Sequence, residues 1–198
     1  MRRPDTGTQR KRGDRRRAFV RVVLAAVLCW QFGLGTAGAV QSGAVPRPVS
    51  ASATLPSLED PKLDALEHVA IAQINEERRA IGVNDLIVSP ELSRIARQYC
   101  RDMAERRFFA HLDPDGKMVY DRAAQGGVSD WTNIAENIAR NRGFDDPAAV
   151  AVREWMKSEG HRDNILNARF VETGLGAWVG PDRTVYFAQI FIRRSPKR

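Results

Sequence analysis

Apolar residues recur every three or four positions in three stretches of the chain, and this spacing predicts three amphipathic helices. The first helix is expected over residues 62–80, after the cap and proline of Asp60-Pro61. The second begins at Ser89-Pro90-Glu91, and another begins at Asp145-Asp146-Pro147. The positions expected to face the core are Leu63, Leu66, Ala70, Ile71 and Ile74 in the first helix, Leu92, Ile95, Ala96, Tyr99 and Met103 in the second, and Ala148, Val152, Trp155 and Met156 in the third.

The end of the third helix carries the first candidate for chemistry. Gly160 suits the left-handed conformation that commonly ends a helix. His161, one of three histidines in the chain, would then lie on the turn that leaves this helix. Such a turn holds an imidazole in a fixed direction and leaves it accessible.

Strand signals follow a different spacing. Residues 131–139 alternate in polarity and predict a short strand. Residues 173–179 and 184–192 are rich in β-branched and aromatic side chains, and the Gly-Pro-Asp-Arg segment at 180–183 joins them as a hairpin. Helices that precede an antiparallel hairpin indicate the α+β class, with a sheet covered by helices.

The first 60 residues differ in composition from the rest of the chain. Residues 1–39 contain nine Lys/Arg and two Asp, so the formal net charge of +7 belongs to this segment. A basic start, an apolar run and a small-x-small step predict an export signal over residues 1–39. The Arg16-Arg17 pair leaves open whether this signal is of the twin-arginine or the ordinary secretory type. Residues 40–60 are expected to form a flexible Ser/Ala/Pro linker, and residues 61–198 the folded domain.

The charge and cysteine counts argue against a nucleic-acid partner and an internal disulfide. Residues 40–198 carry no net charge, which argues against a nucleic-acid partner. Of the two cysteines, Cys29 lies in the leader, so a cleaved chain would keep only Cys100 and could form no internal disulfide. We expect Cys100 to be a packed, unreactive thiol beside the apolar face of the second helix.

Four motifs in order resemble one family. They are Asn75-Glu76-Glu77-Arg78, Phe109-Ala110-His111, Ala135-Glu136-Asn137-Ile138-Ala139, and the stretch from Trp155 to Leu166 that contains Gly160-His161. Together they resemble a bacterial SCP-like member of the CAP superfamily, which includes cysteine-rich secretory proteins, antigen five and pathogenesis-related proteins of class one. The resemblance implies an exported three-layer α-β-α sandwich with a small, largely antiparallel sheet.

The resemblance also implies a central cleft lined by two histidines and acidic side chains. His111, Glu136 and His161 match three of these positions. The fourth position is a glutamate in the animal and plant branches, and Ser158 stands there in this chain. At most three protein ligands are therefore left for a divalent metal.

The three matched residues allow several kinds of chemistry. Two imidazoles and a carboxylate can bind zinc with an open position for water. The same side chains can instead form a hydrogen-bonded structural cluster. Ser158 lies one helical turn before His161, which leaves a serine-type hydrolase as a further alternative.

We therefore expect a secreted or periplasmic binding or interaction module without turnover, and a monomer. Its ligand would be a small molecule, a lipid, a peptide or an envelope component, and membrane contact would involve only an uncleaved N-terminal segment. The alternatives are a metal-assisted or serine-type hydrolase acting on peptide or envelope polymer, and a carrier of lipid or sterol.

Overall fold

A computed structural model describes residues 60–196, so the predicted export signal and nearly all of the predicted linker lie outside the described residues. No helix among residues 60–196 is both long and apolar enough to cross a membrane. The elements in chain order are α1 (Pro61–Ala80), β1 (Ile87–Val88), α2 (Pro90–Glu105), α3 (Val119–Gln125), β2 (Trp131–Asn141), α4 (Pro147–Lys157), α5 (Glu159–Leu166), β3 (Glu172–Val179) and β4 (Val185–Arg194).

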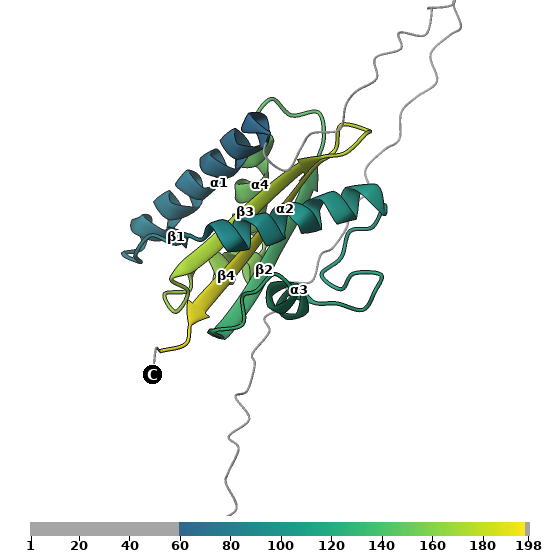
Figure 1. Cartoon of the computed structure of the whole chain (residues 1–198). Helices are drawn as coiled ribbons and strands as arrows, with labels where there is room; N and C mark the ends of the chain where they lie inside the picture. Colours follow the sequence, from purple (N-terminus) through teal and green to yellow (C-terminus); the bar gives the residue numbers. More distant parts are fainter. Residues whose placement is uncertain (1–59, 197–198) are drawn as a thin grey trace, which may run out of the picture.

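The strands form one sheet in the order β1-β3-β4-β2. The predicted hairpin is confirmed as β3 and β4, which pair antiparallel, and β4 also pairs antiparallel with β2. The two-residue strand β1 runs parallel to β3. Helices α2 and α3 lie over one face of the sheet, and α4 lies behind it with α1 packed against α4 (Figure 1). This arrangement confirms the α+β class and the three layers.

The three long helices begin where the sequence predicts. In each, a proline occupies the first turn and the preceding side chain caps the helix. Asp60 accepts the N–H of Lys62 at 2.9 Å, and Asp146 accepts the N–H of Ala149 at 2.9 Å. Short polar caps that satisfy free backbone N–H groups therefore fix these boundaries.

Helix α2 approaches the sheet closely because β3 carries two glycines. A Cβ atom added at Gly174 would lie 2.2 Å from the backbone of Leu92, and one added at Gly176 would lie 2.1 Å from the backbone of Arg97. The close approach also buries Cys100, whose thiol donates to the Gly176 carbonyl oxygen at 3.2 Å. Burial raises the pKa of the Cys100 thiol well above its usual value, as expected for a packed thiol.

The predicted end of the third helix was wrong. Helix α4 ends at Lys157, Ser158 is extended with φ −91° and ψ 121°, and α5 starts at Glu159. Gly160 lies inside α5 and does not have a positive φ. The physical reason is that the extended backbone of Ser158 ends α4, and its carbonyl oxygen accepts the N–H of Arg162 at 2.9 Å to begin α5 before Gly160 is reached. His161 therefore lies in the first turn of α5 instead of on an exposed turn.

Candidate functional site

His111 and Glu136 form a direct pair. Glu136 comes from β2, and His111 lies in the loop that follows α2. His111 Nδ1 lies 2.9 Å from Glu136 Oε2, and their side chains are 12% and 3% exposed. Because an ionised carboxylate only accepts hydrogen bonds, Nδ1 carries the proton and donates it. The pair therefore fixes both the tautomer and the direction of the His111 ring.

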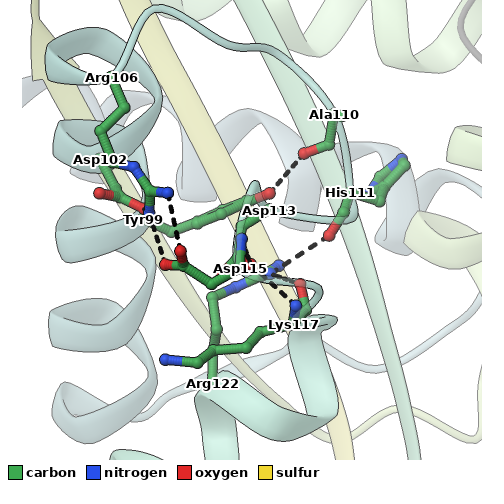
Figure 2. Close-up of polar contacts among 9 residues, drawn as sticks. All are labelled: Tyr99, Asp102, Arg106, Ala110, His111, Asp113, Asp115, Lys117 and Arg122. Carbon is green, nitrogen blue, oxygen red and sulfur yellow. Dashed lines mark hydrogen bonds and ion pairs between the residues drawn. The ribbon is translucent and has the colours of Figure 1, made fainter.

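Arg122 of α3 holds the other side of this carboxylate. Its Nη2 lies 2.6 Å from Glu136 Oε1, and the Arg122 side chain is only 9% exposed. Nη1 donates to the carbonyl oxygens of His111 at 3.2 Å and Lys117 at 2.8 Å (Figure 2). The guanidinium carbon lies 3.4 Å from the centre of the Tyr99 ring, and the Tyr99 hydroxyl donates to the Ala110 carbonyl oxygen. Arg122 thus supports both the carboxylate and the loop that carries His111.

The role of Arg122 was not predicted from the sequence. Helix α3 has seven residues, too few to show an apolar period. In the sequence, Arg122 cannot be told apart from a surface arginine. Only the folded structure shows that it contacts Glu136 of β2. A buried ion pair between distant segments leaves no local spacing that could have revealed it.

His161 approaches the same strand from the other face of the sheet. Successive side chains on a strand point to opposite faces, so Asn137 points away from Glu136. The Asn137 side chain donates to the His161 carbonyl oxygen at 3.0 Å and accepts from Asn164 at 2.9 Å. Because β2 is an edge strand, residues on its two faces can come near each other around the edge. Asn137 and Asn164 thereby fix the first turn of α5, which carries the imidazole.

The His161 ring is buried and lacks a hydrogen-bond partner at one nitrogen. The residue is 6% exposed, and Nε2 contacts no donor or acceptor in the described structure. Burial, and secondarily the neighbouring His111 charge, lower the pKa of His161 from 6.5 to about 4. His161 is therefore neutral at pH 7, and its Nε2 is a buried polar atom in need of a partner.

The three predicted residues are thus brought together only in part. His111 and Glu136 are in contact, whereas no hydrogen bond joins His161 to either of them among residues 60–196. Ser158 makes no hydrogen bond to His161. None of these four side chains lines the cavity of about 360 Å³ beside α2 and α3.

The donor set fits a zinc ion only in part. His161 has the neutral nitrogen that zinc requires, and His111 is the other imidazole of the predicted site. Both oxygens of Glu136 are already engaged, one of them by a guanidinium that competes with a metal cation. No group of three or more His, Cys, Asp or Glu side chains within residues 60–196 is placed to hold a metal ion. A three-ligand site therefore does not fit this arrangement, and the zinc site stays a prediction.

Comparison with known proteins gives the family. The sequence model of the cysteine-rich secretory protein family, CAP, matches residues 71–191. The uncharacterized protein YkwD of Bacillus subtilis is 35% identical over 141 residues, which cover 71% of this chain and 53% of YkwD. The uncharacterized membrane protein YlbC of the same organism is 38% identical over 102 residues, covering 52% of this chain and 27% of YlbC. The chain therefore spans about half or less of the length of these two relatives.

Solved structures agree with this assignment. An extracellular protein of Bacillus anthracis that contains an SCP domain has 26% identity and a TM-score of 0.59, with 67% of this chain and 41% of that chain covered. An outer surface protein of Borrelia burgdorferi shares the fold, with a TM-score of 0.60 at 19% identity over 66% of this chain and 94% of that chain. The chain belongs to the cysteine-rich secretory protein (CAP) family, in the form found in bacterial extracellular proteins with an SCP domain.

Proposed function

We propose that this protein is an exported binding module that holds a polar ligand at His111 and His161 and does not turn it over. The observation that carries the proposal is the His161 ring. Its buried Nε2 has no partner in the described structure, and the ring is neutral at pH 7. An unsatisfied buried polar atom is unfavourable by about 1–3 kcal/mol, and a bound ligand would remove that penalty.

The neighbouring His111 supports binding because its direction is already fixed. Glu136 holds one ring nitrogen, and Arg122 in turn holds Glu136. A group fixed before the ligand arrives loses little conformational entropy on binding. His161 would offer its Nε2 to the ligand as donor or acceptor, beside the fixed His111 ring.

Catalysis is less well supported by the same residues. A serine hydrolase needs its hydroxyl within reach of a base. Ser158 and His161 share no hydrogen bond, and a histidine with a pKa of about 4 is a weak base at pH 7. A hydrolase would therefore need both side chains to rearrange when the substrate binds.

The ligand we propose is a component of the cell envelope. The leader predicted over residues 1–39 would carry the chain out of the cytoplasm. The similar proteins of Bacillus anthracis and Borrelia burgdorferi are described as extracellular and as an outer surface protein. An exported chain meets envelope polymers first, and their hydroxyl and amide groups match the hydrogen-bonding capacity of two imidazoles.

Co-sedimentation with purified bacterial cell-wall sacculi tests the proposal. We expect the wild-type protein to pellet with the sacculi and the His111→Ala/His161→Ala variant to stay in the supernatant. We expect no soluble sugar or peptide to be released. Release of fragments that stops in a Ser158→Ala variant or on addition of a chelator would support the hydrolase instead. Equal pelleting of both proteins would exclude the histidines as the binding site.

A further inference from the structure

A cavity separate from the histidine cluster lies on the α2–α3 side of the molecule. A cavity of about 360 Å³ opens between these two helices and the loop that contains residues 113–117. It shares Arg122 with the Glu136 pair but contains neither histidine of the cluster. Figure 2 shows Asp102 and Arg106 on α2 and Asp115 and Lys117 on the loop. The volume suits a small molecule.

Most charges around this cavity are already neutralised. Arg106 forms two bonds with Asp115, of 2.7 and 3.0 Å, and a third with Asp102 at 3.2 Å (Figure 2). The Asp113 carboxylate accepts the backbone N–H groups of Asp115 at 2.9 Å and Lys117 at 2.8 Å. These two bonds close the turn that starts at Asp113 and direct the Asp113 charge toward its own backbone.

Two cations of the lining form no salt bridge within residues 60–196. Arg94 donates to the Gly126 carbonyl oxygen at 2.9 Å, and Glu91, the carboxylate that it influences, does not line the cavity. The Lys117 ammonium forms no ion pair in the same part of the chain. Both residues line the cavity, and Arg94 is exposed. A carboxylate entering the cavity would therefore gain charge-assisted hydrogen bonds without displacing an existing ion pair.

The remaining polar groups of the lining indicate a ligand that carries hydroxyl groups as well as a negative charge. Gln98 and Gln125 line the cavity, are exposed, and make no side-chain hydrogen bond to any described residue. Asp102 Oδ1 accepts no hydrogen bond in this region, so it is available to a donor such as a hydroxyl group. Ile95 is the main aliphatic side chain in the lining, which leaves little surface for a fatty chain.

We propose that this cavity binds an acidic sugar. The carboxylate of the sugar would lie between Arg94 and Lys117, and its hydroxyl groups would bond to Gln98, Gln125 and Asp102 Oδ1. A sulfate ion carries no hydrogen-bond donor, so it would leave Asp102 Oδ1 without a partner. A neutral sugar would leave both cations unpaired. The combination of one acid group with several hydroxyl groups uses every unpartnered group named here.

Titration calorimetry with glucuronate, and with glucose as the neutral control, tests the site. We expect saturable glucuronate binding and at least about tenfold weaker glucose binding, since each charge-assisted hydrogen bond is worth a factor of this size. The Arg94→Gln/Lys117→Gln variant should lose at least about tenfold in glucuronate affinity by the same reasoning. The Arg153→Gln/Arg169→Gln variant removes the same charge from exposed positions outside the cavity and should bind as the wild type does.

Four results would overturn the proposal. They are no saturable binding, equal binding of glucose, unchanged affinity in the Arg94→Gln/Lys117→Gln variant, and competition by sulfate at the same concentration as glucuronate. An unfolding temperature of the Arg94→Gln/Lys117→Gln variant equal to that of the wild type would show that the variant is folded. The His111→Ala/His161→Ala variant should keep its affinity for glucuronate. If it loses glucuronate binding, the sugar occupies the histidine cluster, which would refute the second site but not the proposed function.

Discussion

Replacing Arg122 by methionine tests whether the Glu136 carboxylate depends on a buried cation. The two side chains are 9% and 3% exposed, with Nη2 and Oε1 2.6 Å apart. Methionine keeps much of the apolar stem but leaves Glu136 charged, buried and bonded only to His111. Removing one partner of a buried ion pair typically destabilises by about 3–5 kcal/mol. The bonds from Nη1 to the carbonyl oxygens of His111 and Lys117 would be lost as well.

The loss would be a large fraction of the free energy of unfolding of a single domain, which is about 5–15 kcal/mol. Urea unfolding at pH 7, followed by the fluorescence of buried Trp155 and Trp178, measures it. Arg79→Met is the matched control, because the Arg79–Asp85 pair is 2.7 Å long but 53% and 50% exposed. We expect the control to lose less than about 1 kcal/mol.

A second substitution separates the charge effect from lost packing. In the Arg122→Met/Glu136→Gln variant the buried charge is absent, so we expect about 2 kcal/mol of the stability to return. A loss in Arg122→Met no larger than that in Arg79→Met would refute the reasoning. So would an Arg122→Met/Glu136→Gln variant no more stable than Arg122→Met.

Three further predictions follow from burial. The His161 imidazole should titrate near pH 4 by NMR. Because the ring of the unfolded chain takes up a proton near pH 6.5, the free energy of unfolding should fall by about 3 kcal/mol as the pH drops from 6.5 to 4. A titration midpoint near pH 6.5, or an equally large fall in the His161→Phe variant, would contradict this. The Cys100 thiol should react with a disulfide reagent only when the protein unfolds, and rapid labelling of the native protein would contradict its burial. Gly176→Ala should destabilise by at least about 2 kcal/mol in urea unfolding, and a neutral effect would mean that α2 can move away from the sheet.

The elements with strong local signals were predictable from the sequence. Proline with a polar cap marks the starts of α1, α2 and α4, and the Gly-Pro-Asp-Arg turn marks the β3–β4 hairpin. These signals act within four or five residues, so they do not depend on the rest of the fold. Helix α3 and strand β1 were not predicted, because seven and two residues are too short to show a period.

The sequence was sufficient to predict which residues form the site, but not which contacts they make. The resemblance to the CAP superfamily identified His111, Glu136 and His161, and the structure joins the first two directly. The resemblance did not reveal that Glu136 and Asn137 point to opposite faces of an edge strand. Arg122 contacts Glu136 on one face, and α5 contacts Asn137 on the other. Such contacts depend on which long-range segments meet, and one sequence carries no signal for that.

Native mass spectrometry of the full chain, expressed with its leader and recovered from the exported fraction, tests the binding role most directly. We predict a non-covalent adduct on the wild-type protein that is absent from the His111→Ala/His161→Ala variant. A wild-type protein without an adduct, or the same adduct on both proteins, would contradict the assignment of the two histidines as the ligand site.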